Sequence, residues 1–317
     1  MNLSTIPLPL PPLNEQKRIV AKLDAIMPRI EAVKARLDKV PGILKRFRQS
    51  VLTAAVTGKP TEQWREEHPE VGEWEEKTLQ DVTDYQGGYA YKSIKFIESS
   101  DNQVLKIANV KVYGVDIDIA PSFIDDEYAK ETERFMLKEN DVIISMTGTR
   151  NKRDYGFNGI IRQTTRKLFL NQRVARLRCY EKNILPEILS LILKTPEFRE
   201  FFFKDETGNV NQGNVGADAL KLAPLLLPPL SEQKEIVRQV DKLFALADKV
   251  EAHYQKAKAR VDKLSQSVLA KAFRGELVPQ DPNDLPAAEL LKQILAEKDK
   301  MAAQLKKRKT KNVKQRK

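Results

Sequence analysis

The chain has 317 residues, of which 41% are hydrophobic and 31% charged, and its 55 lysines and arginines against 44 aspartates and glutamates give a net charge of +11. This length predicts about two domains, and the positive charge favours a polyanionic partner such as nucleic acid, with a basic protein that has no such partner as the alternative. The single cysteine, Cys179, excludes internal disulfides and cysteine-rich metal sites, while the lack of a signal peptide in Met1–Pro7 and of an apolar run near ~18 residues predicts a cytoplasmic protein.

One segment of the sequence occurs twice. Pro-Pro-Leu-Asn-Glu-Gln-Lys-Arg-Ile-Val at 11–20 returns as Pro-Pro-Leu-Ser-Glu-Gln-Lys-Glu-Ile-Val at 228–237, and Gln-Ser-Val-Leu at 49–52 returns in the same register at 266–269. The copies lie much farther apart than the roughly 20–50-residue period of solenoid repeats. The repeat therefore predicts one structural element that is used twice, on either side of a different domain.

Each copy has the pattern of a long helix. Asn14 and Ser231 are good N-cap residues, and a glutamate follows each of them in the first turn. Gly58 and Gly275 stand where the two helices should stop. The predicted helices cover 14–58 and 231–275.

Apolar residues recur along both helices at alternating spacings of four and three, which is typical of a coiled-coil seam. Pro28 and Pro41 should kink or interrupt the first helix. We expect the helices to pair antiparallel, because one compact domain then bridges the end of the first and the start of the second. Two unrelated surface helices are the alternative, but they leave the shared register unexplained.

A polar linker is predicted over 59–73, and an α+β domain over 74–230. Its clearest strand-like runs and its predicted helix cover 104–107, 142–146, 174–178 and 185–203. The predicted fold class is therefore α+β, with one globular domain flanked by two long helices that form an antiparallel coiled coil.

The central domain carries a concentration of positive charge. Between Ser145 and Arg178 there is one acid, Asp154. The cations of that stretch are Arg150, Lys152, Arg153, Arg162, Arg166, Lys167, Arg173, Arg176 and Arg178. Such a distribution is typical of a surface that contacts phosphate groups.

Three glycine-containing loops of this domain suit DNA recognition. In 147–153, Gly148 lets backbone N–H groups approach a phosphate, and arginine side chains suit guanine edges. Loops 86–92 and 211–214 carry aromatic and amide side chains, and amides pair with adenine. Each loop alone is more typical of a solvated turn, but together in a basic chain they indicate DNA contact.

The predicted DNA-facing residues are Arg150, Lys152, Arg153, Asn171, Arg173, Gln212 and Asn214, with Thr149 in the same loop and Tyr89, Tyr91 and Lys92 behind them. No catalytic or metal-binding residue is predicted, because the two histidines, His68 and His253, lie far apart, one in the linker and one on a helix. Motifs for amino-group methylation and for ATP binding are not found.

The last segment, 276–317, combines a predicted helix with a basic tail. Pro-Asn-Asp-Leu-Pro at 282–286 precedes a helical pattern that extends to about Leu305. The tail from Lys306 onward holds cations and no acid, which is typical of a solvated, disordered run. It can still add non-specific affinity for phosphate.

Together these features resemble the specificity subunit of Type I restriction–modification enzymes. The resemblance covers about 6–295. It rests on the doubled Pro-Pro-Leu-x-Glu-Gln-Lys-x-Ile-Val opening and the Gln-Ser-Val-Leu close, which look like the family's spacer helices. The segment 74–222 looks like a target recognition domain, through its runs at 141–148, 171–174 and 208–214.

The resemblance implies a non-catalytic DNA reader. One recognition domain would read half of a bipartite target, and the helices would set the spacing and bind modification subunits. Those subunits would carry S-adenosylmethionine and methylate adenine, so this chain itself is expected to hold no cofactor. Restriction subunits would join them to cleave DNA.

One departure concerns the number of recognition domains. The family pattern is domain, helix, domain, helix, whereas 1–13 resembles only the final strand of a first domain. The expected subunit is therefore half-length, pairing with a second copy or with another half specificity subunit. The alternatives are a coiled-coil scaffold or adaptor that binds protein or non-specific DNA, and an inactive fragment that serves as a recombination donor.

Overall fold

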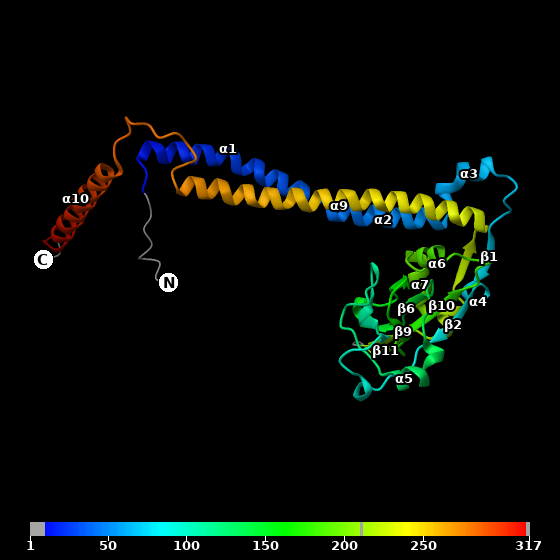
Figure 1. Ribbon diagram of the computed structural model, residues 1–317. Coiled ribbons are helices and arrows are strands. Elements are labelled where there is room, and N and C mark those ends of the chain that lie inside the picture. The colour runs from blue at the N-terminus through cyan, green and yellow to red at the C-terminus, as the bar shows by residue number, and fades with distance from the viewer. Residues whose placement is uncertain (1–9, 210–211, 315–317) are drawn as a thin grey trace. The chain divides into compact units, whose positions relative to one another are not determined.

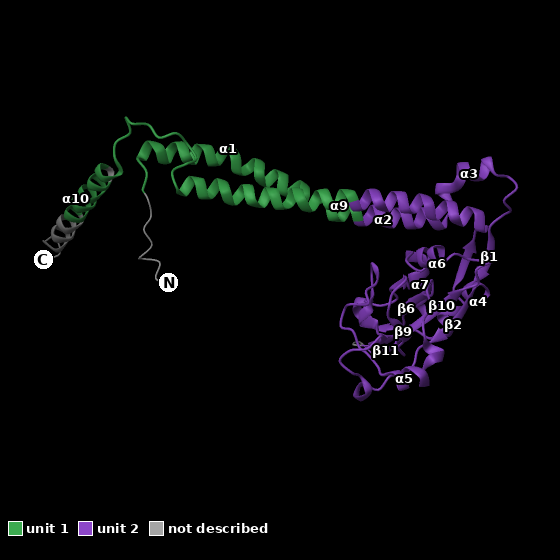
Figure 2. Cartoon of the chain, viewed as in Figure 1, with its two compact units in different colours: residues 1–44, 249–317 green, residues 45–248 purple. Residues whose placement is uncertain are grey.

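The computed structural model describes residues 10–209 and 212–314, and Figure 1 labels its main elements. The chain divides into two compact units. The first comprises residues 1–44 and 249–317, and the second comprises residues 45–248 (Figure 2). Among the helices of the described ranges, none combines the length and the apolar character that a membrane span requires.

The first unit is built from helices. It contains α1 (Leu13–Leu37), the start of α2 (Val40–Val56), the C-terminal part of α9 (Leu230–Phe273) and α10 (Ala287–Lys314). Early in α1, Oε1 of Glu15 lies 3.4 Å from the position that a Cβ on Gly275 would occupy. Later in α1, Lys34 Nζ lies 4.0 Å from Asp262 Oδ1. Within this unit α1 and α9 therefore run antiparallel.

Apolar seam residues of this unit differ in burial. Ile19 and Ile30 of α1 and Tyr254 of α9 are buried, whereas Val33 and Leu264 are exposed. After α9 the chain is held back onto α1 by an ion pair that joins Arg18 Nη2 and Asp284 Oδ2 at 2.7 Å. The α10 helix continues to Lys314, beyond the predicted end near Leu305.

The first predicted helix is interrupted where Pro41 indicates, because the chain turns at 38–39 between α1 and α2. Pro41 explains the position of the break, since a proline without an N–H is tolerated only in the first turn of a new helix. Pro28 lies inside α1 without ending it. Gly58 and Gly275 adopt left-handed backbone with φ of 71° and 72°, as their predicted positions after the helices suggest.

The second unit holds the sheets. A four-stranded sheet has the order β2-β10-β6-β8, and a three-stranded sheet has the order β11-β12-β7. Three two-stranded sheets pair β1 with β13, β3 with β9, and β4 with β5. The strands are β1 (Glu75–Thr78), β2 (Thr83–Gly87), β3 (Asn102–Leu105), β4 (Val110–Lys111), β5 (Gly114–Val115), β6 (Val142–Ser145), β7 (Thr147–Gly148), β8 (Asn158–Ile160), β9 (Lys167–Leu170), β10 (Val174–Cys179), β11 (Thr207–Asn209), β12 (Gln212–Asn214) and β13 (Pro224–Leu227).

Short helices connect these strands. They are η2 (Lys59–Thr61), α3 (Glu62–Glu67), α4 (Leu79–Val82), η3 (Ser93–Lys95), η4 (Ile107–Asn109), α5 (Asp126–Glu131), η5 (Glu133–Phe135), η6 (Arg150–Lys152), α6 (Pro186–Ile192), α7 (Pro196–Lys204) and α8 (Ala217–Lys221). β6 and β10 lie where the sequence predicts strands, and β3 begins slightly earlier than its predicted run. The mixture of helices and strands agrees with the predicted α+β class.

The predicted single helix over 185–203 is wrong, because this segment forms two helices, α6 and α7, with a break at 193–195. Thr195 is the N-cap of α7, and its Oγ1 accepts a hydrogen bond from Phe198 N at 3.2 Å. Pro196 follows at the first helical position, which ends the preceding helix and starts the next one.

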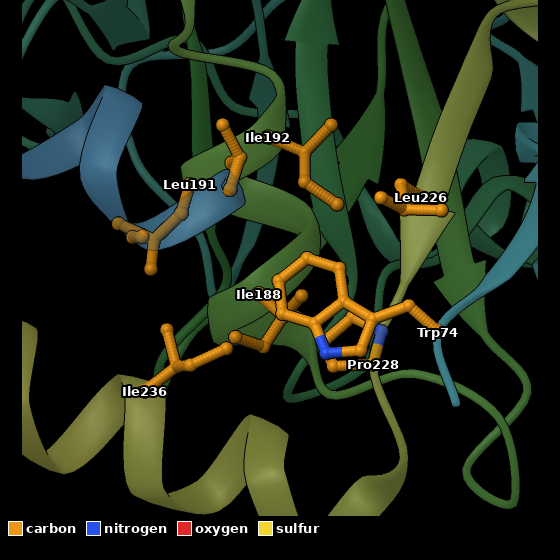
Figure 3. Close-up of a pocket in the computed structure, with 9 residues that line it drawn as sticks. Trp74, Ile188, Leu191, Ile192, Leu226, Pro228 and Ile236 are labelled. Atoms are coloured by element: carbon orange, nitrogen blue, oxygen red, sulfur yellow. The ribbon is translucent and has the colours of Figure 1, made fainter. Parts of the chain in front are cut away.

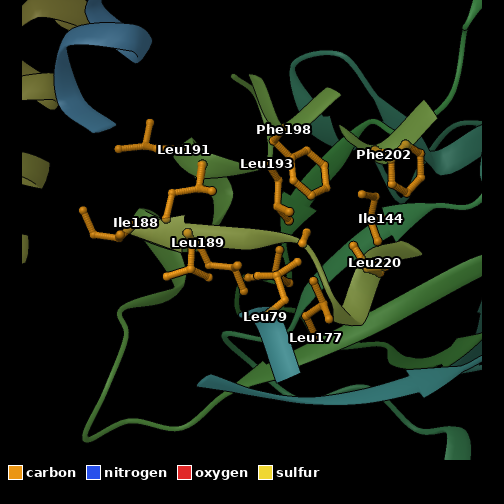
Figure 4. Close-up of a cluster of buried hydrophobic side chains, with 14 of the residues drawn as sticks. Leu79, Ile144, Leu177, Ile188, Leu189, Leu191, Leu193, Phe198, Phe202 and Leu220 are labelled. Carbon is orange, nitrogen blue, oxygen red and sulfur yellow. The ribbon is translucent and has the colours of Figure 1, made fainter. Parts of the chain in front are cut away.

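Both helices pack on the four-stranded sheet. Leu189 and Phe202 are fully buried in the same cluster as Ile144 and Leu177 of the strands (Figure 4). Each such side chain contributes about 1.5–3 kcal/mol when removed from water. The sheet, α6 and α7 therefore form one core.

The ends of the long helices belong to this core. Val51 and Leu52 of α2 and Ile236 and Val240 of α9 are members of the buried cluster. Figure 3 shows Trp74, Ile188 of α6 and Ile236 of α9 around one small apolar cavity. The second unit thus extends past the predicted 74–230 domain into both helices.

The linker is fastened to the start of α9 by a buried carboxylate. Glu232 accepts hydrogen bonds from Thr61 Oγ1 at 2.6 Å, Arg65 Nη1 at 2.5 Å and Trp74 Nε1 at 2.7 Å. The Glu232 side chain is 0% exposed, so its charge is compensated by these donors rather than by water. The linker is consequently an ordered part of the second unit.

Candidate nucleic-acid interface

Three loops meet at one end of the four-stranded sheet because of strand direction. β2 and β6 both pair antiparallel with β10, in registers that place Gly87 opposite Ala175 and Ser145 opposite Val174. The chain leaves β2 and β6, and enters β10, at this same end. Neighbouring strands are only about 4.8 Å apart, so the loops that follow β2 and β6 and the loop that precedes β10 lie close together.

Gly88 permits the closest approach between two of these loops. A Cβ on Gly88 would lie 2.0 Å from the carbonyl oxygen of Asn171. Backbone hydrogen bonds from Tyr89 N to Leu170 O at 2.9 Å and from Gln172 N to Tyr89 O at 2.8 Å hold the contact. The loop after β2 therefore holds the loop before β10 in place.

A hairpin from later in the chain completes this end of the domain. β12 pairs with β7, so that Gly213 lies opposite Gly148 and Asn214 opposite Thr147. Gly208 has a φ of 106°, which favours glycine at this hairpin position. The pairing carries the polar residues of the hairpin to the loop that follows β6.

The end of β6 and the loop that follows it, the loop that precedes β10, the hairpin and η4 line a cleft of about 410 Å³. Its lining residues are Ile107, Ala108, Ser145, Thr147, Gly148, Thr149, Asp154, Arg173 and Gln212. The structure thus brings together Thr149, Arg173 and Gln212, which the sequence predicts to face DNA. Asp154 and Ser145 line the same cleft and are missing from the predicted set.

Arg173 and Gln212 are the predicted residues best placed to bind a ligand. Both are exposed at the cleft. Lys152 and Lys92 are exposed as well. Within the described residues, no ion pair engages Lys92, Lys152 or Arg173. Their charges are therefore available to an external anion.

Arg150 and Arg153 instead support the loop. Arg150 Nη1 donates to Gly208 O at 3.1 Å, and its Nε lies 3.5 Å from the carboxylate of Glu206. Arg153 has a φ of 44°, and its guanidinium lies 4.9 Å from the ring centre of Phe203. Both side chains are exposed to solvent, but their guanidinium groups contact residues of the same domain.

Side chains of the second unit also hold the residues before the hairpin and the end of the loop that follows β6. The Tyr155 hydroxyl donates a hydrogen bond to Glu206, and burial together with that bond raises the pKa of Tyr155. Arg199 of α7 donates to the carbonyls of Arg153 and Gly156, each at 3.1 Å. Burial lowers the pKa of Arg199. These contacts fix the return of the loop toward β8.

Tyr91, which the sequence predicts to lie behind the DNA-facing residues, is buried and does not line the cleft. Tyr91 is 8% exposed and packs edge-on against Tyr128, with ring centres 5.4 Å apart. Its burial raises the pKa of the phenol to about 12. Tyr89 is half-buried against the same aromatic group, whereas Lys92 reaches the surface. Aromatic side chains here support the loop rather than present a stacking face.

The remaining predicted residues lie at the edges of the loops. Asn171 and Asn214 are half-buried, and Asn171 Oδ1 accepts a hydrogen bond from Arg173 N at 3.4 Å. Thr149 N donates to Asp154 Oδ1 at 2.6 Å. These contacts shape the loops that present Arg173 and Gln212.

The basic stretch offers fewer open charges than the sequence indicates. Several of its arginines form ion pairs inside the second unit: Arg162 with Glu187, Arg166 with Asp118, Arg176 with Asp84, and Arg178 with Asp141. Such pairing depends on tertiary contacts. At the cleft and the loop beside it, the exposed cations outside these ion pairs include Arg173 and Lys152.

Neither histidine forms a metal site. His68 Nδ1 lies 2.8 Å from Trp64 O, and its ring stacks on Trp64 with centres 4.3 Å apart. In the described part of the chain, no group of three or more histidine, cysteine, aspartate or glutamate side chains is arranged to hold a metal ion.

Solved structures share this fold. A chain described under "Structural basis underlying complex assembly and conformational transition of the type I R-M system" matches with a TM-score of 0.63 and 22% identity, over 85% of this chain and 62% of that chain. The HsdS subunit from Thermoanaerobacter tengcongensis matches with a TM-score of 0.51 and 21% identity, over 87% and 65%.

Sequence comparison identifies the family. The chain is 34% identical over 303 residues to the Type I restriction enzyme EcoKI specificity subunit of Escherichia coli (strain K12), covering 92% of this chain and 64% of the relative. This chain therefore spans less than two thirds of that relative's length. A family sequence model matches residues 72–258, which is more than half of the chain. The chain belongs to the family described as the Type I restriction modification DNA specificity domain.

Proposed function

We propose that this protein is a sequence-specific DNA-binding subunit that directs Type I methylation and cleavage to one half of a bipartite target. The observation that carries the proposal is the cleft lined by the loops after β6 and before β10, by η4 and by the hairpin. Its lining includes the amide Gln212 and the cation Arg173, which has no ion-pair partner among the described residues. Family membership supports it, because the relative named above is a specificity subunit of a Type I restriction enzyme.

The chemistry of the cleft suits base recognition. Arginine forms paired hydrogen bonds with the O6 and N7 atoms of guanine, and glutamine does so with adenine. Lys152 lies on the adjoining loop and is suited to a phosphate group. The net charge of +11 adds non-specific attraction to DNA.

The helices are proposed to act as a spacer that forms an antiparallel coiled coil. In the first unit Lys34 meets Asp262, and in the second unit Arg48 Nη2 lies 2.7 Å from Asp248 Oδ1. In the first unit this contact and the approach of Glu15 to Gly275 give the antiparallel direction of α1 and α9. In the second unit the contact joins α2 to α9.

Exposed apolar side chains on the helices are the proposed docking surface for modification subunits. In the first unit they are Val20, Val33, Ile43, Val250 and Leu264, and in the second unit Leu246. Exposed apolar side chains gathered on long helices are typical of a surface that a partner covers. The modification subunits would carry S-adenosylmethionine and the catalytic residues, and restriction subunits would join the assembly.

A bipartite target requires two recognition domains. We propose that a second copy of this chain, or another half specificity subunit, supplies the second domain. Two identical domains related by a two-fold axis would read an inverted, interrupted sequence.

Light scattering of the complex with its modification subunit tests the assembly. We expect two copies of this chain per complex, and a single copy with one modification subunit would contradict the pairing. A chain that binds no modification subunit, and binds DNA irrespective of sequence, would favour the scaffold alternative.

A further inference from the structure

Asp154 is the one acid between Ser145 and Arg178, and it lines the cleft described above. Its side chain is exposed, and its Oδ1 accepts a hydrogen bond from Thr149 N at 2.6 Å. Within the described residues its carboxylate has no cationic partner within ion-pair distance. The other acid of this region, Glu206, is different, because its side chain is 6% exposed and engaged by Arg150 and Tyr155.

An exposed carboxylate is unfavourable on a surface that binds a polyanion. It repels every phosphate and so lowers affinity for all DNA sequences alike. The repulsion is offset only where the carboxylate accepts a hydrogen bond from the DNA. In the major groove cytosine offers its N4 amino group, which is the usual partner of aspartate and glutamate.

The anchoring of Asp154 suits this task. The hydrogen bond from Thr149 N fixes one carboxylate oxygen and leaves the second oxygen to a ligand. Gly148 leaves room beside it, because a Cβ there would lie 2.8 Å from Cβ of the buried Tyr155 and 2.7 Å from Asp154 Oδ1. Arg173 lines the same cleft and has the donors that guanine accepts. A carboxylate and a guanidinium together match the two bases of a C·G pair.

From this arrangement we infer that Asp154 is a specificity-determining residue that accepts a hydrogen bond from the exocyclic amino group of a cytosine in the target. This inference rests on the proposed function. It goes further by naming one residue, one base and the direction of the hydrogen bond. The carboxylate lowers affinity for every sequence and regains it where a base amino group, here the N4 group of cytosine, donates to it. Asp154 therefore discriminates between sequences.

Selection from a duplex library with a randomised segment tests the inference, using the full chain in complex with its modification subunit. The wild-type consensus should contain a cytosine whose replacement weakens binding by about 5- to 140-fold. In Asp154→Asn the amide oxygen can still accept the hydrogen bond from Thr149 N, but the NH₂ group that replaces the second oxygen donates hydrogen bonds and cannot accept one from cytosine. This variant should lose discrimination at that position only, while binding to non-specific DNA becomes stronger.

Asp101→Asn is the matched control. It removes the same charge from an exposed residue that precedes the first residue of β3. The last residue of β3, Leu105, is the one whose carbonyl accepts a hydrogen bond from Asn171 N beside the cleft. The consensus of Asp101→Asn should equal that of the wild type. Asp154→Ala should abolish the same single preference as Asp154→Asn.

The outcomes separate the two proposals. A wild-type complex without any sequence preference would overturn the proposed function and this inference with it. A clear wild-type consensus that Asp154→Asn leaves unchanged would overturn the inference alone. Weakening at all positions in both Asp154 variants would assign Asp154 only a structural role in the loop, which also overturns the inference.

Discussion

The indole Nε1 of Trp74 donates a hydrogen bond to Glu232 Oε2 at 2.7 Å, which fastens the segment before β1 to the first turn of α9. Thr61 and Arg65 occupy the other oxygen of the same carboxylate. Glycine is favoured at position 58, because its φ is 71° and a Cβ there would lie 2.8 Å from the Trp74 ring. One buried carboxylate thus secures the linker against α9, the helix that follows β13.

Glu232→Ala should therefore destabilise the second unit by about 2–4 kcal/mol, because it leaves buried donors without an acceptor. Urea unfolding followed by circular dichroism measures the loss. Asp248→Ala is the control, since its exposed ion pair with Arg48 should contribute less than about 1 kcal/mol. Equal losses in the two variants would contradict the role assigned to Glu232.

Gly88→Ala should disturb the support of the cleft. The new Cβ would lie 2.0 Å from Asn171 O, so the backbone of one loop must move. We expect a loss of about 1–3 kcal/mol in unfolding free energy, together with weaker specific DNA binding. At Gly216 an added Cβ meets nothing within 4 Å, so Gly216→Ala should change stability by less than about 0.5 kcal/mol. A stable, fully active Gly88→Ala variant would show that the close approach is dispensable.

Arg173 and Lys152 should differ in how their loss affects DNA binding. Arg173→Ala should cost about 1–3 kcal/mol at one base position and relax specificity there. Lys152→Ala should weaken all sequences alike and lower the salt dependence of binding by about one counterion. Titrations at several salt concentrations, with target and mismatched duplexes, measure both effects. Arg162→Ala is the control, because that side chain pairs with Glu187.

Cys179 should be unreactive in the folded protein. Burial raises the pKa of its thiol to about 12, so the thiolate that attacks thiol reagents is scarce near neutral pH. Labelling with a disulfide reagent at pH 8 should be slow until urea unfolds the chain, and should then become fast. Rapid labelling of the native protein would show that the strand end around Cys179 opens readily.

The pair formed by Glu235 and Arg238 gives a stability contribution that depends on pH. Hydrogen bonds from Arg238 lower the pKa of Glu235 to about 2, below its ordinary value of 4.5. The folded state therefore favours the ionised form, so the contribution is present above pH 4.5 and is lost as the pH falls through about 2. The stability difference between wild type and Glu235→Gln, followed by urea unfolding from pH 6 to pH 2, should shrink toward zero. Arg238 is half-exposed, so the difference should stay below about 1 kcal/mol.

Local chemistry is enough to predict many of the elements. Gly58 and Gly275 mark helix ends because left-handed backbone favours glycine. The apolar run of β6 is a fully buried strand, and β10 is buried over its first four residues, Arg176 included. The break at Thr195 and Pro196 carries its own signal, a cap followed by a proline, and the predicted helix over 185–203 overlooked it.

The candidate site was less predictable, because its contacts join residues far apart in sequence. Arg150 has the character of a DNA-binding arginine, yet Glu206 and the Gly208 carbonyl engage it. Tyr91 is buried by Tyr128, which sequence spacing does not indicate. Asp154 carried a usable signal as the lone acid in a basic stretch. Its place beside Arg173 and Gln212 follows only from the pairing of β12 with β7 and from strand direction.

The central claim is that this chain selects the DNA sequence on which a Type I modification subunit acts. Mapping of methylated adenines tests it most directly, after genomic DNA is incubated with the complex of this chain, its modification subunit and S-adenosylmethionine. We predict methylation confined to one interrupted consensus, and no such consensus when the modification subunit acts without this chain. Methylation that is absent, or spread without regard to sequence, would contradict the claim.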